Sequence, residues 1–157
     1  MTIWRIHLKP LGVDPYPFQF CIANNIIGVG WPLDVRTDGI SLEEYEANYG
    51  MGDKSWRTAI NAIGHDMDIG DFVWTRDNNR IYYLGRIISV WFYCGASEEY
   101  SETGFGSARR CEWRRIEDEN IVPVEVVDSF DGQTVECIHI NADAIAVRSQ
   151  EIYLTGR

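Results

Sequence analysis

Side chains that could act as a nucleophile or a general base are few in this sequence, and they are not grouped. The three histidines are His7, His65 and His139. Nucleophilic catalysis needs a nucleophile, a base and a third group that orients the base. His65 and Asp66 are sequence neighbours, whose side chains rarely point at each other, and no serine has the flanking glycines of a nucleophile elbow. We therefore expect a protein that is not an enzyme.

The glycine and cysteine patterns predict neither a cofactor nor a metal ion. Gly28-Val29-Gly30 begins like a dinucleotide-binding fingerprint, but the third glycine is missing and Pro32 stands where a helix should begin. The four cysteines form no C-x-x-C pair and have no histidine at metal-ligand spacing. We expect reduced, mostly buried thiols, which are typical of a cytoplasmic protein.

Aromatic side chains placed among polar residues are the stronger chemical signal. The chain has six Trp and eight Tyr. Nucleic-acid bases stack on such rings with about 1–3 kcal/mol per base, and a base turned out of a duplex is held in this way while hydrogen bonds read its edge. Trp31 follows two glycines that give a partner close access to the backbone. Trp31 is thus expected either to stack on a base, whose edge Asn24, Asn25 and Asp34 would read, or to fill the core.

Charge is unevenly distributed along the chain. The formal net charge is −10, which argues against tight non-specific binding to nucleic acid, because that binding depends on many phosphate contacts. Acids predominate between residues 34 and 53, whereas arginines cluster in two groups between residues 76 and 115. The second group contains Arg109, Arg110, Arg114 and Arg115. The pattern predicts either a local basic face or strand faces that are simply solvated.

Hydrophobic periodicity indicates the elements that would position these residues in the first half of the chain. Alternation over residues 3–8 predicts a half-buried strand, and residues 18–31 predict two short strands with a turn at Asn24-Asn25. Helices are predicted over 38–50, with a capping box of Ser41 and Glu44, and over 55–64. Gly50 and Gly64 are expected to end them. The apolar stripe of the second helix consists of Trp56, Ile60 and Ile63.

After residue 70 the period changes to two. A hairpin is predicted from Phe72–Arg76 and 81–89, followed by strands over 90–94 and 109–116. Residues 95–108 form a polar loop, a candidate lid or disordered segment, and residues 133–140 and 142–153 fit either strand or short helix. Strands and helices do not alternate regularly, so we expect one α+β domain of 157 residues, a small β-barrel with helices inserted between the early strands.

Three segments resemble an EVE-type domain of the PUA-like superfamily: "NIIGVGWPLD", "IGDFVWTRDNNRIYYLGRIISVWFY" and "RRCEWRRIEDENIVP". In that family a G-x-G segment lies on an early strand and a Gly-Asp-hydrophobic strand follows the helices. A hairpin then carries Tyr-hydrophobic-Gly-x-Ile, and a later strand has a Trp before a hydrophobic-Pro step. The similarity covers about residues 3–125, and the order and spacing of the elements carry it.

The resemblance implies a partly open β-barrel with flanking helices, a PUA-like fold over residues 1–157. YTH domains of the same superfamily hold a modified base in an aromatic cage, and similar domains read targets in modification-dependent restriction and antiphage systems. By position, the cage would be formed by Trp31, Trp91 and Tyr93. Phosphate contacts would be made by Arg109, Arg110, Arg114 and Arg115.

We therefore expect a non-catalytic module without a cofactor that binds nucleic acid, DNA rather than RNA, and recognises a modified base flipped into an aromatic pocket. The expected partner is a nuclease or NTPase effector, separate or fused. No membrane association is expected, because no apolar run approaches the ~20 residues that span a bilayer. Two alternatives stay open: a protein-interaction or small-ligand module in which Trp31 is core, and an RNA reader with the same pocket.

Overall fold

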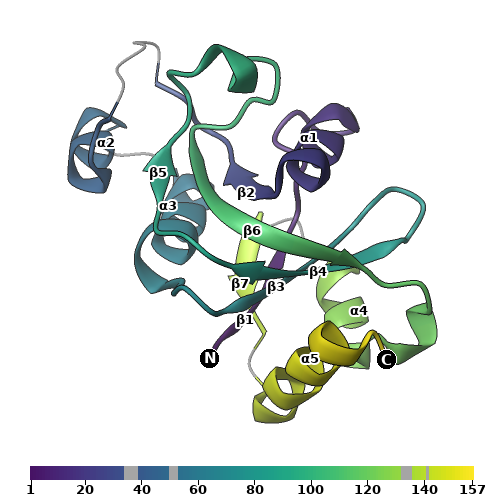
Figure 1. The fold of residues 1–157 in the computed structure, drawn as a ribbon. Coiled ribbons are helices and arrows are strands. Elements are labelled where there is room, and N and C mark those ends of the chain that lie inside the picture. The colour runs from purple at the N-terminus through teal and green to yellow at the C-terminus, as the bar shows by residue number, and fades with distance from the viewer. Residues whose placement is uncertain (34–38, 50–52, 132–135, 141) are drawn as a thin grey trace.

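The chain folds around one curled, mixed β-sheet with helices on both sides, as the computed structural model shows (Figure 1). The structure describes residues 1–33, 39–49, 53–131, 136–140 and 142–157, and these contain seven strands and five α-helices. The strand order is β2-β6-β4-β3-β1-β7, and the short β5 pairs with β6. The expected α+β fold with a barrel-like sheet is confirmed at this level.

The elements are short, and most are separated by tight loops. The strands are β1 Ile3–Ile6, β2 Ile26–Val29, β3 Phe72–Arg76, β4 Tyr82–Ile87, β5 Phe92–Tyr93, β6 Ser107–Arg115 and β7 Cys137–His139. The α-helices are α1 Tyr16–Asn24, α2 Leu42–Tyr49, α3 Lys54–Ile60, α4 Val124–Phe130 and α5 Asp143–Thr155. A π-helix, η1 Asn61–Asp66, continues α3, and two 3₁₀ turns are η2 Glu98–Tyr100 and η3 Glu119–Ile121.

The longest strand, β6, holds the sheet together. Its first half pairs antiparallel with β2, from Ser107 opposite Val29 to Arg110 opposite Ile26, and also with β5. Its second half pairs antiparallel with β4. Among the described strands, β1 and β3 form the parallel pair. Because β6 pairs with different strands along its length, the sheet curls rather than lying flat.

The sheet buries both of its faces, so the prediction that β1 is half-buried is wrong. Trp4 and Ile6 pack into a core shared with α1 and α3, whereas Ile3 packs into a second core under α4 and α5. Arg5 is also fully buried, and its guanidinium carbon lies 5.7 Å from the centre of the Phe130 ring. The alternation of β1 identifies its two faces correctly, but it does not show that the C-terminal helices cover the second one.

One predicted strand is a helix. Residues 16–24 form α1, and Pro17 lies in its first turn, where proline is tolerated because that N–H has no intrahelical partner. Its buried positions are Pro17, Phe18 and Cys21, and the spacings of four and three residues to Cys21 fit a helical period better than an alternating one. The predicted turn is confirmed, since Asn25 has a positive φ of 55° and caps the helix.

The predicted second helix does not end at Gly64. It continues as η1, in which the Met67 N–H donates to the carbonyl of Ala62 at 2.9 Å. A Cβ on Gly64 would lie 3.0 Å from a methyl group of Leu42, so this glycine allows α2 to pack closely. The stripe of Trp56, Ile60 and Ile63 is fully buried, as predicted.

The other predictions are confirmed in most cases. The Ser41 hydroxyl accepts the Glu44 N–H at 3.1 Å and donates to its carboxylate, as expected for a capping box, and the hairpin of β3 and β4 forms. The predicted stop at Gly50 lies outside the described residues. The loop 95–108 packs against the core, where Tyr100, Thr103 and Phe105 are buried, so it is not a disordered segment.

Gly85 on β4 gives the first testable prediction. A Cβ here would overlap the Sγ of Cys111 and lie 2.8 Å from the Trp113 ring. Gly85→Ala should therefore destabilise the fold by about 1–3 kcal/mol, as overpacking of a core does, measured by urea denaturation. Arg86→Ala, at the exposed neighbouring position, is the control and should change stability by about 0.5 kcal/mol or less. A Gly85→Ala protein as stable as its parent would contradict this packing.

Glu136 gives a second prediction, about pH. Its carboxylate accepts the Gly30 N–H at 3.3 Å and so links β2 to the start of β7. Burial raises the pKa of Glu136 to about 7, although the Gly30 hydrogen bond lowers it. Since the unfolded chain loses this proton near pH 4.5, stability should fall as pH rises from about 4.5 to about 7 and then level off.

Glu136→Gln removes this titration. The free energy of unfolding of the variant minus that of the parent should increase by about 1–2 kcal/mol from pH 5 to pH 8. This figure is reduced because the carboxyl is only partly buried. Urea denaturation of both proteins at the two pH values measures the gain. A stability difference that is constant across the range would show that the carboxyl is not titrating in this way.

Candidate ligand-binding site

An open hollow of about 740 Å³ lies where α2, η1 and β5 meet. Trp91, Phe92 and Tyr93 of β5 and its preceding loop line one side. Ile40 and Leu42, at the start of α2, line another, and η1 contributes Gly64 and His65. The hollow is therefore mainly apolar and aromatic, and it is assembled from segments that are far apart in the sequence.

The ring of Tyr45 positions the aromatic side chains behind this hollow. It is fully buried on α2, and its centre lies 5.7 Å from that of Trp91 and 5.8 Å from that of Tyr93. Its hydroxyl donates to the carbonyl of Trp31 at 2.7 Å and accepts the indole N–H of Trp56 at 3.2 Å. A buried phenol needs such partners, and these bonds fix the ring. Tyr45 was missed from sequence, although its place within the capped helix predicted for 38–50 offered a signal.

The indole N–H of Trp91 is a hydrogen-bond donor in an unusual environment. Its indole nitrogen is buried and has no hydrogen-bond partner among the described residues, while the side chain as a whole is partly exposed at the hollow. A buried N–H without an acceptor is costly, and such groups occur at sites where function requires them. Trp91 is therefore the best candidate in this hollow for direct contact with a ligand.

Trp31 is joined to this aromatic group through its backbone. Its carbonyl accepts the Tyr45 hydroxyl, and two residues later the N–H of Leu33 donates to the Tyr93 hydroxyl at 3.0 Å. The Trp31 ring is partly buried against the same core and is not among the described residues that line the hollow. The structure thus brings Trp91 and Tyr93 together and places Trp31 next to them.

The two glycines before Trp31 do not leave the backbone open to a partner, contrary to expectation. A Cβ on Gly28 would lie 2.7 Å from the ring of Phe105, so that ring already occupies the space. A Cβ on Gly30 would meet Pro10 at 3.5 Å. Gly28 is needed because an internal side chain approaches it closely.

The predicted edge-reading residues lie elsewhere. Asn25 is at the opposite end of β2 from Trp31, where its carbonyl accepts the Cys111 N–H at 2.9 Å and holds β6 in place. The exposed Asn24 donates from its side chain to the carbonyl of Phe20 at 2.9 Å. Neither asparagine is among the described residues lining the hollow. Asp34 lies outside the described residues.

Arg109 lines the hollow but is almost fully buried. Its Nε donates to the carbonyl of Ile63 in η1 at 2.6 Å, and one Nη donates to the carbonyl of Ser89 at 3.1 Å. Burial lowers the pKa of its guanidinium, and the nearby carboxylates of Asp68 and Asp71 oppose that shift. These bonds make Arg109 a support for the wall of the hollow.

The other three predicted arginines are exposed on β6. The guanidinium carbon of Arg110 lies 5.8 Å from the centre of the Phe92 ring, so this charge is held beside a ring that lines the hollow. Arg114 lies over Tyr153 at 5.2 Å, and Arg115 is 3.7 Å from the carboxylate of Glu117. Arg110 and Arg114 point to the same face of the strand, with the exposed Glu112 between them, so this face carries two positive charges and one negative charge.

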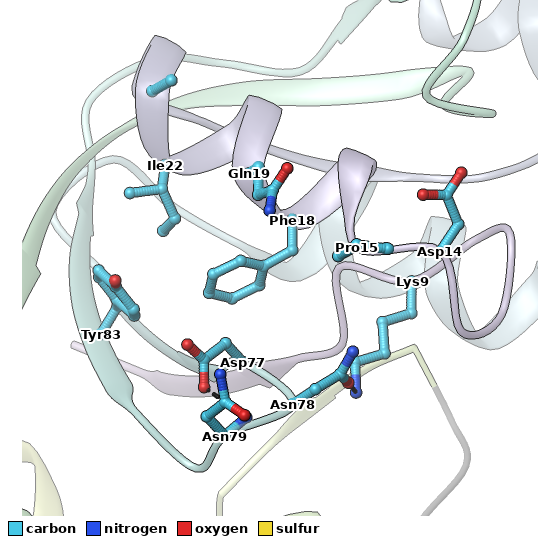
Figure 2. Close-up of a pocket in the computed structure, with 11 residues that line it drawn as sticks. Lys9, Asp14, Pro15, Phe18, Gln19, Ile22, Asp77, Asn78, Asn79 and Tyr83 are labelled. Carbon is cyan, nitrogen blue, oxygen red and sulfur yellow. Dashed lines mark hydrogen bonds between the residues drawn. The ribbon is translucent and has the colours of Figure 1, made fainter.

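A second hollow, of about 400 Å³, lies between α1 and the turn that joins β3 to β4 (Figure 2). Phe18 and Tyr83 form its apolar part, and Lys9, Asp77 and Asn78 lie at its edge. No group of histidine, cysteine and acidic side chains in the described residues could hold a metal ion. No described helix has the length and apolar content needed to cross a membrane.

Comparison with known proteins assigns the chain to a family. No curated protein matches it in sequence. A family model described as "Domain of unknown function (DUF8426)" matches residues 4–139, which include both hollows and nearly all of the sheet but not α5. Because this match covers most of the sequence, the chain belongs to the DUF8426 family of domains of unknown function.

Proposed function

We propose that this chain is an EVE-type domain of the PUA-like superfamily that binds nucleic acid without catalysing a reaction. Its ligand is a modified base in DNA, turned out of the helix into the hollow between β5, α2 and η1. The observation that carries the proposal is the pairing of Trp91 and Tyr93 at one open hollow, with the Trp91 indole N–H buried and lacking an acceptor among the described residues.

The size and lining of the hollow suit a planar guest. About 740 Å³ is within the usual range for small-ligand sites, which are mostly apolar with a few polar groups. A base stacks on aromatic rings whatever its identity, and a methyl group adds apolar surface that such walls favour. Because the Trp91 N–H is buried, the indole ring would have to turn toward the hollow before this group could donate to a ring nitrogen or carbonyl of the base, and that bond would then satisfy it.

The distribution of charge favours one orientation for the nucleic acid. Arg110 stands beside Phe92 at the β6 side of the hollow, and Arg114 adds a second positive charge on the same face of the strand, beyond Glu112. The exposed carboxylate of Asp68 lines the hollow itself. Phosphates would therefore follow β6, whereas Asp68 could accept a hydrogen bond from the exocyclic amine of an adenine or cytosine.

Trp91→Ala should weaken binding to a modified oligonucleotide by about tenfold or more, since one stacked base is worth about 1–3 kcal/mol. The measurement is fluorescence anisotropy over plain, N6-methyladenine and 5-methylcytosine oligonucleotides, as DNA and RNA, single- and double-stranded. Trp91→Phe keeps a ring and should retain most of the affinity. Tyr16→Ala, which removes an exposed ring outside the hollow, is the off-site control, with folding checked by circular dichroism.

Two results would overturn the proposal. The first is a folded parent protein that binds none of the oligonucleotides at low salt. The second is a Trp91→Ala protein that binds them as its parent does. Preference for the RNA members of the panel would keep the pocket and change the nucleic acid.

Neighbouring arginines on β6 should behave differently from each other. Arg110→Ala should reduce the slope of log affinity against log salt by about 0.7–0.9, the value of one phosphate contact. Arg109→Ala should instead destabilise the fold by about 3 kcal/mol, because it leaves the carbonyls of Ile63 and Ser89 without their donor. Arg80→Ala, on the β3–β4 turn, should leave the slope unchanged. An unchanged slope for Arg110→Ala would place the phosphates elsewhere.

A further inference from the structure

The second hollow is independent of the first. None of its described lining residues lines the other hollow, and it lies against the opposite end of the sheet, between α1 and the β3–β4 turn (Figures 1 and 2). Nothing in the proposed base-binding site uses it. A volume of about 400 Å³ is large enough for a small organic molecule.

Its interior is apolar and partly aromatic. The rings of Phe18 and Tyr83 meet edge to face, with centres 5.5 Å apart, and Ile22 and Pro15 extend the apolar surface. Figure 2 shows Phe18 in the middle of the hollow, with Tyr83 and Ile22 on one side and the β3–β4 turn on the other. Ring faces of this kind attract a cation as well as an apolar group.

Two carboxylates stand at the edge of this apolar surface. One oxygen of Asp77 accepts the N–H groups of Asn79 and Ile81, at 2.8 and 2.9 Å, and one oxygen of Asp14 accepts the Tyr16 N–H at 2.9 Å. The second oxygen of each makes no hydrogen bond within the described part of the chain, and neither residue has an ion pair there. These two negative charges are therefore not neutralised by the surrounding described residues.

The nearby cation does not neutralise them either. Among the described lining residues the positively charged one is Lys9, whose Nζ donates to the side-chain oxygen of Asn78 at 2.6 Å. The lysine is thus held by an amide, while both carboxylates keep a free oxygen. The hollow consequently favours donors and positive charge, and it disfavours a phosphate or carboxylate.

We propose that this hollow binds an organic cation: an ammonium or guanidinium group joined to an apolar body. The apolar body packs on Phe18 and Tyr83, and the cation lies at the acidic edge, where both Asp77 and Asp14 attract it. The same chemistry can come from a free small amine or from an arginine or lysine side chain of another protein. The net charge of −10 adds a general attraction for either source.

The test uses phenethylamine as the probe and phenylacetate, which has the same ring and the opposite charge, as its control. Each is titrated into the full chain and followed by two-dimensional ¹H–¹⁵N NMR. Phenethylamine should shift saturably the side-chain amides of Asn78, Asn79 and Gln19, which line the hollow. Phenylacetate should leave them unchanged.

Charge-neutralising variants test the carboxylates. Asp77→Asn and Asp14→Asn keep the oxygen that accepts the turn N–H groups, and each should weaken phenethylamine binding by about two- to fivefold, the range for a partly exposed ion pair. Asp128→Asn removes a charge from the exposed surface of α4 and is the matched control, with no expected change. Equal binding of amine and acid, or shifts unaffected by both hollow variants, would overturn the proposal.

A second titration separates the two sources of the cation. N-acetyl-arginine amide represents a protein side chain, and its tighter binding at the same amide signals would identify a protein partner. Tighter binding of phenethylamine would identify a free amine. Since the oligonucleotide panel reports on the other hollow, failure of one proposal leaves the other standing.

Discussion

The sharing of β6 among three strands is the constraint on which the rest of the structure depends. Its first half is bonded to β2 and β5 and its second half to β4. Three glycines accommodate groups that pack closely against this part of the sheet. Gly28 admits the Phe105 ring, Gly85 admits Trp113, and Gly106 admits the backbone of Trp31. The resulting curl carries β5 toward α2 and so creates the hollow that Trp91 lines.

Two hollows at opposite ends of one sheet differ in charge more than in apolar character. Aromatic rings line both, and charges of both signs lie at each: Arg109 and Asp68 line the first, with Arg110 beside it, and Lys9, Asp14 and Asp77 line the second. The second differs in that both of its carboxylates keep an oxygen without a hydrogen bond in the described part of the chain. On our two proposals, the rings favour binding in each hollow and the charged edge selects the ligand.

Local signals were sufficient for elements whose residues contact their own neighbours in sequence. The Ser41 and Glu44 box, the stripe ending at Ile63 and the β3–β4 hairpin depend on short-range bonds and periodicity, and all three formed as predicted. The prediction failed at α1, where Phe18 and Cys21 share a helical face within a segment that also alternates. Of the residues that the family resemblance placed at the site, Trp91, Tyr93 and Arg109 line one hollow, whereas Asn24 and Asn25, expected beside Trp31, lie at the far end of β2.

The sequence by itself determined the α+β class, most of the strands and the high content of aromatic residues. Only the tertiary structure decided which rings face solvent, because alternation assigns a residue to one face of a strand but does not reveal what covers that face. Arg109 illustrates the difference: its type suggested a phosphate contact, whereas its position between Ile63 and Ser89 made it an internal support. Whether a side chain is buried depends on residues that are distant in the chain and that tertiary packing brings next to it.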